Sequence, residues 1–276
     1  MTPARAAVGG LIVCPTPIGN LDDVTLRVLA ALRGADVIAC EHPRHTRVLL
    51  DRHGIAARLV GFHEHNEKAR AAELAARMLE GAVVALVSDA GTPLVSDPGF
   101  ELVRACLAAG VRLEVLPGPS AAVTALVASG LPVERWRFVG FPPRSRRELE
   151  RLLVQTQDTL VAFESPRRLA ATLAVLAAGD PQRPVAVCRE LTKLHEEIRR
   201  GSAAEVADHY RRSAARGEVV LVCGAAPPAR LPNREALAAV RELIEARAKA
   251  RPAAAAVAKL TGVPANQLYR ELLGAS

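Results

Sequence analysis

Three short polar clusters combine groups that can exchange a proton with groups that can bind an anion. The first, Glu41-His42-Pro43-Arg44-His45-Thr46, places an acid, two imidazoles and a guanidinium within five residues. The second is Ser88-Asp89-Ala90-Gly91, and the third, Arg189-Glu190-Leu191-Thr192-Lys193, again pairs acid with base. Carboxylates and imidazoles are the usual acid–base groups of enzymes, while guanidinium and ammonium groups bind phosphate or carboxylate. These clusters are therefore candidates for an active site, with a solvated helix start or simple ion pairs that hold loops as the alternative.

Apolar runs precede each of these clusters. Residues 83–87 are apolar without alternation, which is typical of a strand covered on both faces in a parallel sheet. Similar runs at 36–40 and 184–188 lead into the first and third clusters. Ligands bind at the carboxyl ends of strands in open α/β sheets. We therefore expect the polar clusters to lie at sheet edges that are open to a ligand.

Strand and helix patterns alternate along most of the chain, which predicts two α/β domains with mainly parallel or mixed sheets. We place the first domain at 1–116 and the second at 117–226. Residues 227–232 are rich in proline and read as a linker. Residues 231–276 then predict a helical tail resembling a helix–turn–helix, which is either a nucleic-acid reader or a small helical bundle.

Two further loops, rich in proline and glycine, connect a strand to a helix. They are Cys14-Pro15-Thr16-Pro17-Ile18-Gly19-Asn20 and Pro117-Gly118-Pro119-Ser120. Such loops let a ligand approach the backbone, although neither is a G-x-G-x-x-G or Walker sequence. We expect Asn20 and Ser165 to cap helices that begin directly after them. If the loop after residues 83–87 binds no ligand, the alternative is that Asp89 closes an Asx-turn and Asp97 caps the next helix.

The charge balance favours a polyanionic partner such as nucleic acid. The chain has 36 basic and 29 acidic residues, a formal net charge of +7, although a basic proteome or plain solubility would give the same balance. Aromatic residues make up 3%, which argues against a surface that stacks on many bases. Arg144, Arg146 and Arg147 follow a Pro-Pro loop and suit phosphate contacts, with a solvated helix face as the alternative.

The cysteine and histidine pattern predicts no metal site. The five cysteines are scattered in apolar runs without a C-x-x-C, so we expect buried thiols in a reducing compartment. His63 and His65 have no obvious third ligand, and we expect them to cap a helix at 67–79. No signal peptide is apparent and no apolar stretch reaches the roughly 18 residues of a membrane span. The expected location is the cytoplasm.

Five motifs occur in a characteristic order over residues 11–223. They are Cys14-Pro15-Thr16-Pro17-Ile18-Gly19-Asn20-Leu21, Glu41-x-x-Arg44-His45-Thr46, Leu86-Val87-Ser88-Asp89-Ala90-Gly91-Thr92-Pro93, Pro117-Gly118-Pro119-Ser120 and Arg189-Glu190-Leu191-Thr192-Lys193. Together they resemble the type I family of small-subunit ribosomal RNA methyltransferases in the tetrapyrrole-methylase-like superfamily. The family usually reads Glu-Asp-Thr-Arg-His-Thr where this chain has His42 and Pro43.

The resemblance implies S-adenosylmethionine as the cofactor and a cytidine 2′-hydroxyl of small-subunit ribosomal RNA as the methyl acceptor. It also implies a homodimer that acts on RNA within the small ribosomal subunit, and a cofactor cleft between the two domains. Cofactor-lining residues carried over from the family are Pro15, Gly19, Ser88, Asp89, Ala90, Leu94, Ser120 and Ala121, with Phe163 and Leu191 closing the cleft.

Methyl transfer to a ribose hydroxyl benefits from a group that accepts its proton. Glu41, His45 and Glu190 are the candidates, while Arg44 and Lys193 suit binding of phosphate or lowering of the hydroxyl's pKa. Arg144, Arg146 and Arg147 would contact the RNA. Two alternatives remain: methylation of a tetrapyrrole-like or other small acidic molecule, whose carboxylates these arginines would bind, and a non-catalytic nucleic-acid-binding regulator that uses the tail.

Overall fold

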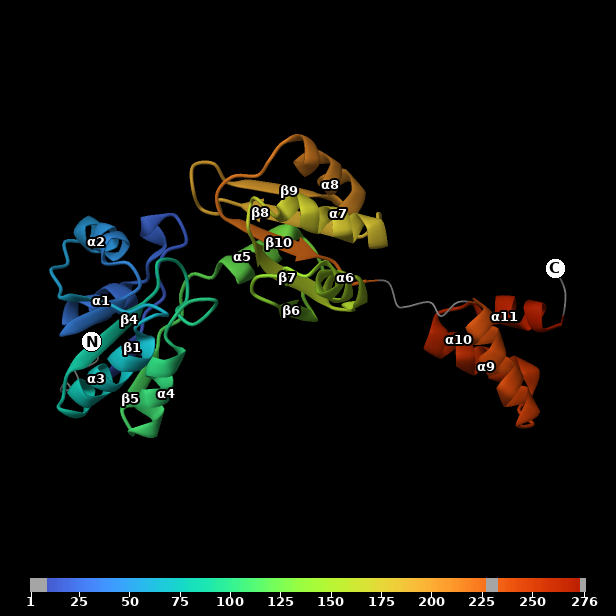
Figure 1. Cartoon of the computed structure of the whole chain (residues 1–276), viewed down its shortest axis with the longest axis horizontal. Helices are drawn as coiled ribbons and strands as arrows, with labels where there is room; N and C mark the ends of the chain where they lie inside the picture. Colours follow the sequence, from blue (N-terminus) through green and yellow to red (C-terminus); the bar gives the residue numbers. More distant parts are fainter. Residues whose placement is uncertain (1–8, 227–232, 274–276) are drawn as a thin grey trace.

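A computed structural model describes residues 9–226 and 233–273, which form two sheets with their helices and a separate group of three helices (Figure 1). The first sheet has the order β3-β2-β4-β1-β5, and every pairing in it is parallel. Its strands are β1 (Gly10–Val13), β2 (Val37–Cys40), β3 (Leu59–Gly61), β4 (Val83–Val87) and β5 (Arg112–Val115). The parallel α/β arrangement expected for this half is confirmed.

Strand β4 is covered on both faces, as its uninterrupted apolar run predicts. Val84 and Leu86 pack into a cluster with α3 (Glu67–Leu79) and α4 (Phe100–Ala108). Ala85 and Val87 pack on the other face with α1 (Leu26–Gly34) and α2 (Pro43–Arg52). Burying one such Val or Leu side chain stabilises a fold by roughly 1.5–3 kcal/mol. The core therefore fixes the position at which β4 ends and the polar loop at Ser88 begins.

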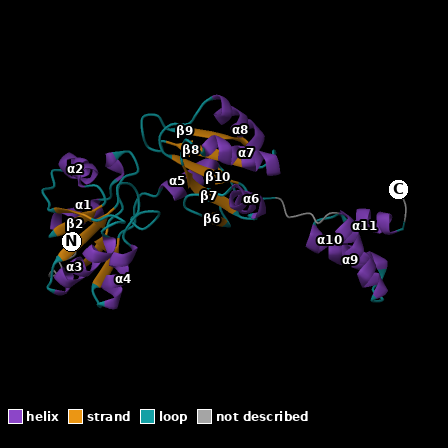
Figure 2. Cartoon of the chain, in the orientation of Figure 1, coloured by secondary structure: helices purple, strands orange, loops and turns teal. Residues whose placement is uncertain are grey.

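The second sheet is mixed, with the order β6-β7-β10-β8-β9. Its strands are β6 (Trp136–Phe138), β7 (Thr159–Glu164), β8 (Pro184–Arg189), β9 (Glu197–Ser202) and β10 (Val219–Cys223). Among its described strands, β6 and β7 are the one pair of parallel neighbours. One face packs with α6 (Arg146–Gln155), α7 (Leu169–Gly179) and α8 (Ala203–Arg212), and the other with α5 (Ala121–Ser129), as Figure 2 lets the reader follow.

Two local expectations are wrong, and one strand was not expected. The helix expected directly after Asn20 is interrupted. Asn20 caps only a 3₁₀ turn, η1 (Leu21–Asp23). Helix α1 begins after Thr25, whose side chain accepts from the Val28 N–H. Ser165 precedes a turn, and α7 begins only at Leu169. Strand β9 was not expected, because an edge strand that reads Glu-Ile-Arg-Arg-Gly-Ser has no apolar run.

The three C-terminal helices form a unit with its own core. They are α9 (Asn233–Glu245), α10 (Ala250–Thr261) and α11 (Ala265–Leu272), and they meet around Val240, Val257 and Leu268. Gly262 ends α10 with φ +71°, a left-handed conformation that favours glycine at the turn into α11. The expected linker, residues 227–232, lies outside the described residues, and the division of the chain at 116/117 and 226/231 stays a prediction.

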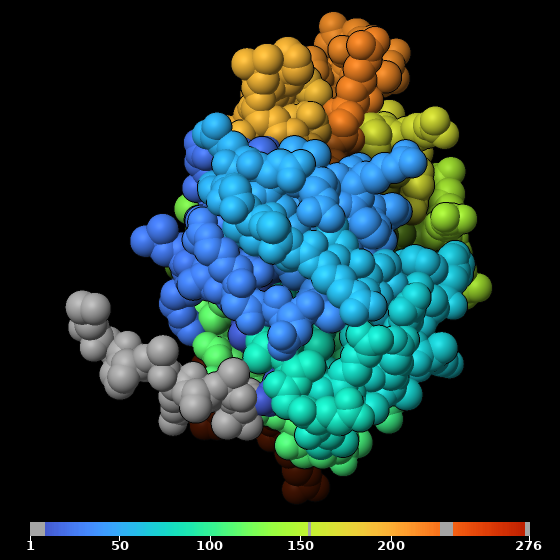
Figure 3. All heavy atoms as spheres, turned by 90° about the vertical axis from the view of Figure 1, so that its left-hand side faces the viewer, coloured from blue at the N-terminus to red at the C-terminus, as the bar shows by residue number. Residues whose placement is uncertain are grey.

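The two sheet-containing units lie next to each other along the long axis of the molecule (Figure 1). Seen from the end that carries the first sheet, this unit covers much of the second (Figure 3). Loops that follow β1, β4 and β5 face the second unit. Within the described chain, no helix combines the length and the apolar character needed to cross a membrane.

Candidate active site

A hollow of about 380 Å³ lies between loops of the two sheets. Ile18 and residues of the 90–97 loop line it from the first sheet. Ser120 and Ala121 at the start of α5, Phe163 in β7 and Leu191 after β8 line it from the second. The volume falls in the range of ordinary ligand pockets, roughly 300–1,000 Å³. The carboxyl ends of strands from the first sheet thus form one wall of a single ligand-sized site.

Hydrogen bonds join the loop after β1 to the loop after β4. The Thr16 hydroxyl donates to the Ser88 carbonyl over 3.0 Å, and the backbones of Thr16 and Gly91 exchange hydrogen bonds of 2.8 and 2.9 Å. The Ser88 hydroxyl in turn donates to the carbonyls of Ala90 and Gly91. These bonds satisfy polar groups that would otherwise be buried unpaired. They hold Ala90 at the wall of the hollow.

Backbone strain gathers in the two loops that enclose the hollow. Five non-glycine residues in the described chain have a positive φ, and four of them are Leu94, Ser96, Glu190 and Thr192. Such conformations cost of order 1–3 kcal/mol each and persist only where the surrounding structure holds them. The Thr192 backbone N–H donates to Glu196 over 2.6 Å, and its hydroxyl accepts from the Asn20 N–H over 3.0 Å. These two bonds hold the loop after β8, and the bond to Asn20 crosses between the units.

Glu190 and Lys193 form a hydrogen-bonded ion pair. Lys193 Nζ lies 3.0 Å from Glu190 Oε1 and 3.0 Å from Glu218 Oε2, and the Glu218 backbone N–H donates to Glu190 Oε1 over 2.9 Å. That backbone bond, helped by Lys193, holds the pKa of Glu190 below its usual value. Burial lowers the pKa of Lys193, but the hydrogen bonds and charges of Glu190 and Glu218 raise it by more, so the pKa lies above its usual value. Glu190 is thus a poor proton acceptor, and Lys193 stays charged.

Asp97 is a site residue that the sequence pattern did not single out for chemistry. It lines the hollow, and burial raises its pKa to about 6, with the Ser88 hydroxyl acting against the shift and the charges of Glu41 and Asp89 adding to it. The expected role as a helix cap is wrong, because Glu67 accepts from the Gly99 and Glu101 backbone N–H groups over 2.9 and 2.8 Å. A carboxylate on α3 takes the capping role, and Asp97 faces the hollow instead.

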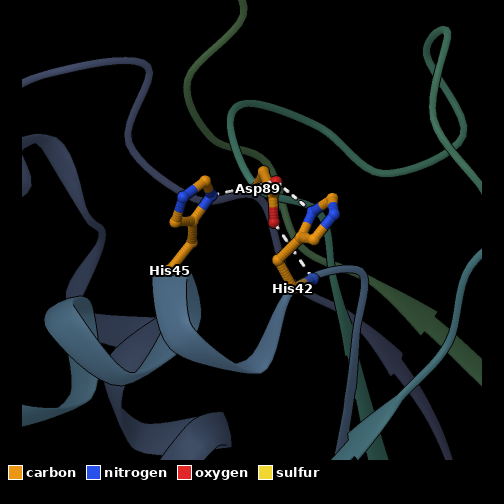
Figure 4. Close-up of side chains that lie close together, drawn as sticks. All are labelled: His42, His45 and Asp89. Atoms are coloured by element: carbon orange, nitrogen blue, oxygen red, sulfur yellow. Dashed lines mark hydrogen bonds and ion pairs between the residues drawn. The ribbon is translucent and has the colours of Figure 1, made fainter.

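Asp89 bonds across the sheet edge and does not close an Asx-turn. Its Oδ2 lies 2.6 Å from His42 Nδ1 and 3.1 Å from His45 Nδ1, and its Oδ1 accepts from the His42 backbone N–H over 3.2 Å (Figure 4). Arg44 is exposed, and no ion pair to Glu41 is present in the described part of the chain. The first polar cluster is therefore tied to the second through Asp89.

The structure brings some of the expected site residues together and places others behind them. Ala90, Ser120, Ala121, Phe163 and Leu191 line the hollow. Residues in the surrounding loops that are not part of its lining are Pro15, Gly19, Ser88, Asp89 and Leu94. The five expected catalytic residues divide, with Glu41, Arg44 and His45 at the first sheet, Glu190 and Lys193 at the second, and none of them in the lining.

The three arginines expected to bind RNA are exposed near the amino end of α6. Arg146 pairs with Glu150 over 2.8 Å, an exposed contact of little energetic weight. Phe141, a few residues before Arg144, lines the hollow. The Arg168 guanidinium donates to the carbonyls of Pro142 and Pro143 over 3.0 and 2.9 Å. The loop that leads from the hollow to the arginines is thereby fixed.

Comparisons with known proteins give consistent matches. The sequence model of the tetrapyrrole (corrin/porphyrin) methylase family matches residues 10–207. Ribosomal RNA small subunit methyltransferase I of Mesorhizobium japonicum is 46% identical over 278 residues, which cover 98% of this chain and 94% of that protein. The protein of the same name from Escherichia coli O157:H7 is 43% identical over 276 residues, 96% of this chain and 95% of that one.

Solved structures share the fold of the two sheet-containing units. The uroporphyrin-III C-methyltransferase of Thermus thermophilus is 26% identical with a TM-score of 0.56, over 78% of this chain and 94% of that one. A crystal structure of a uroporphyrin-III C-methyltransferase from that organism complexed with S-adenyl homocysteine has a TM-score of 0.54 at 22% identity, over 78% of this chain and 97% of that one. At the latter identity the likeness concerns the fold alone.

Proposed function

The chain belongs to the tetrapyrrole methylase family and, within it, to the ribosomal RNA small subunit methyltransferase I family; from this premise we propose that it methylates the 2′-hydroxyl of a cytidine in small-subunit ribosomal RNA. S-adenosylmethionine is the methyl donor. The observation that carries the proposal is the single hollow lined by Ala90 from one sheet unit and Ser120, Phe163 and Leu191 from the other.

The residues around the hollow fit this cofactor. Ile18, Phe163 and Leu191 supply apolar walls of the kind that an adenine ring requires. Ser120 supplies a hydroxyl for the polar amino-acid end. When bound, S-adenosylmethionine supplies an electrophilic methyl group on a sulfonium. The protein's task is then alignment of the hydroxyl with that methyl group, which can account for up to about 7–11 kcal/mol of the barrier.

Asp97 is the carboxylate best suited to accept the proton of the ribose hydroxyl. Its raised pKa, about 6, lies near the operating pH, where a general base is most effective. Glu164 also lines the hollow, but Thr172, the Ser165 N–H and Arg168 occupy its oxygens. Glu190 is held ionised by its hydrogen bonds. Glu41 acts on Asp97 only through its charge, and His45 is bonded to Asp89. Arg44 and Lys193 would bind phosphate near the reacting ribose.

The partners follow from the same surface. Arg144, Arg146 and Arg147 would contact RNA phosphates, consistent with a net charge of +7. The acceptor would be RNA within the small ribosomal subunit, in the cytoplasm.

We also propose a homodimer. Val123 and Val127 lie one turn apart on α5 and are 47% and 72% exposed, so they offer apolar surface for a contact with a second copy of the chain. Light scattering after gel filtration tests this point, and a monomeric mass contradicts it.

Labelled S-adenosylmethionine offered with small ribosomal subunits, naked ribosomal RNA or a tetrapyrrole tests the proposed reaction. We expect label in the RNA that survives alkali as a resistant dinucleotide, because a 2′-O-methyl group blocks the attack that cleaves RNA. Label in the tetrapyrrole would favour the small acidic substrate. Nucleic-acid binding without any affinity for the cofactor would favour a regulator. Either of these results would overturn the proposal.

A further inference from the structure

The fold brings together three side chains that can each supply a metal ligand. His42 and His45 lie 47 and 44 residues from Asp89 in the sequence, so the spacing of the residues gave no sign of the cluster. Their ligand atoms, the two Nδ1 nitrogens and a carboxylate oxygen, all lie within 4.8 Å of one another. Figure 4 shows the two imidazoles on either side of the carboxylate. Two imidazoles and a carboxylate are a common ligand set for zinc.

The cluster is held in place by the elements that carry it. Pro43 begins α2, and His42 and His45 sit at the N-cap and in the first turn of this helix. Asp89 follows β4, the strand beside β2 in the sheet, and its Oδ1 is fixed by the His42 backbone N–H at 3.2 Å. A bond of this kind to the other carboxylate oxygen is how metal ligands are commonly oriented. The ligand atoms therefore converge from two neighbouring elements of the first sheet unit.

The exposure and charge of the site suit a cation that reaches it from solvent. The side chains of His42 and His45 are 62% and 69% exposed, and that of Asp89 is 26% exposed. Glu41 and Asp97 add negative charge at the same sheet edge, since Glu41 and Asp89 both act electrostatically on Asp97. Arg44 and the amino end of α2 act in the opposite direction. The site is therefore open to solvent and has two further acids near the Asp89 ligand.

We propose that His42, His45 and Asp89 bind one divalent transition-metal ion of the zinc class beside the hollow. Binding requires each imidazole to offer the lone pair of Nδ1, so the hydrogen that Nδ1 donates to Asp89 must move to Nε2 or, from a protonated ring, to solvent. Metal–ligand bonds of about 2.0–2.2 Å replace the two His–Asp hydrogen bonds. Water or another oxygen ligand completes the coordination. The site is additional to methyl transfer and does not depend on the proposed substrate.

Calorimetric titration of the full-length, untagged, chelator-treated protein with ZnCl₂ tests the proposal. We expect one Zn²⁺ per chain, and His42→Ala should weaken binding at least about tenfold, as loss of a metal partner does. The matched control is His65→Ala, which removes an exposed histidine from the other pair and should leave binding unchanged. Co²⁺ should give a visible absorption band with the wild-type protein that His42→Ala abolishes.

Absence of saturable Zn²⁺ binding by the wild-type protein would overturn the proposal. Equal weakening in His42→Ala and His65→Ala would do the same, since it would mean scattered binding to surface histidines. Circular dichroism establishes that each variant is folded, and His42→Gln replaces His42→Ala if the latter is not. Neither RNA nor S-adenosylmethionine is present, so the outcome is separate from that of the methylation assay.

Discussion

At the scale of single residues, Asp89 and Asp97 lie in one loop but have different surroundings. Both follow a serine, and their sequence contexts made both candidates for local turns or caps. Asp89 instead bonds to His42 and His45, and Asp97 faces the hollow. Neither outcome could be predicted from the sequence, because each depends on a partner from a distant element: α2 for Asp89, and Glu67 of α3 for the cap that Asp97 does not make.

Replacing Asp97 by asparagine should stabilise the fold at neutral pH while lowering methyl transfer. The pKa of Asp97 is about 6 in the folded protein against an ordinary 3.8, so folding favours the protonated acid. Below the unfolded pKa, Asp97 is protonated in both states and does not change the free energy of unfolding. As pH rises from about 4 to 6, burying the carboxyl group lowers the free energy of unfolding. The Asp97→Asn variant would avoid that loss, by about 1 kcal/mol after allowance for solvent screening. Urea unfolding at several pH values measures it.

The exposed Asp23 provides the control for this experiment. Asp23→Asn should leave the pH dependence of the unfolding free energy as in the wild type. If Asp97→Asn also leaves it unchanged, the carboxylate at position 97 is not in the buried setting described above. The accompanying fall in the methylation rate should be about 10²–10⁴-fold if Asp97 accepts the proton.

Removing the Glu190 carboxylate should loosen the loop after β8. Glu190→Gln takes away an ion pair with Lys193 and weakens the bond from the Glu218 N–H, which together stabilise by about 1–2 kcal/mol. The pKa of Glu190 is lowered in the folded state, so this stabilisation is present above the unfolded pKa and is lost as pH falls through the folded one. Thermal unfolding should show a lower midpoint at pH 7 and a smaller difference in acid.

Glu218→Gln is the comparison, because the Glu218 side chain is 70% exposed while that of Glu190 is 20% exposed. Its effect on the midpoint should be clearly smaller, since exposed pairs contribute little. An equal fall in the unfolding midpoint for both substitutions would mean that either partner of Lys193 stabilises the loop to the same extent. That result would contradict the central role given to Glu190.

At the scale of elements, uninterrupted or periodic apolar patterns were predictive. The run at β4 and the helix α3 appear with the expected bounds, Val83–Val87 and Glu67–Leu79. The elements that escaped prediction lack such a pattern. Strand β9 is polar and lies at a sheet edge, and the break between η1 and α1 depends on the extended backbone of Val24 and Thr25. The strand depends on its pairing with β8, and the helix break depends on the caps at Asn20 and Thr25. The periodicity of apolar residues contains no information on either.

The contact between the loop after β1 and the loop after β8 depends on a glycine. A Cβ at Gly19 would lie 2.5 Å from Lys193 Cγ, 2.7 Å from Thr192 Oγ1 and 2.9 Å from the Leu191 carbonyl oxygen. Gly19→Ala should therefore displace residues 191–193 and cost about 1–3 kcal/mol. It should also weaken S-adenosylmethionine binding at least about tenfold, because Leu191 lines the hollow. Calorimetry measures the affinity.

Gly34→Ala is a suitable control for Gly19→Ala. Gly34 ends α1, and a Cβ there would meet nothing within 4 Å. This substitution should leave cofactor affinity unchanged and, if anything, stabilise the helix. A Gly19→Ala protein with the affinity of the wild type would show that the two loops need not touch for the cofactor to bind.

At the scale of the whole molecule, the two sheet-containing units carry the hollow and the three C-terminal helices have their own core. The sequence predicted both kinds of unit from their alternation and composition. It could not predict which loops from the two units face each other, since no local pattern encodes a contact such as Asn20 to Thr192, 172 residues apart.

Removal of the chain after Pro227 should affect RNA more than the cofactor. The tail core is formed by α9, α10 and α11 alone, so the rest of the protein should keep its fold. We expect the KM for small ribosomal subunits to rise at least about tenfold if the tail is the nucleic-acid reader that its helix–turn–helix pattern predicts, because its basic residues would add phosphate contacts. The Kd for S-adenosylmethionine should change little. Equal losses in both would make the tail a structural part of the cofactor site.

A crystal structure of the protein grown with S-adenosylmethionine tests the central claim most directly. The two facing sets of loops should hold the cofactor in the hollow of about 380 Å³, in contact with Ala90 on one side and Ser120 on the other. A cofactor bound elsewhere, or touching the loops of only one sheet, would contradict this account of the site.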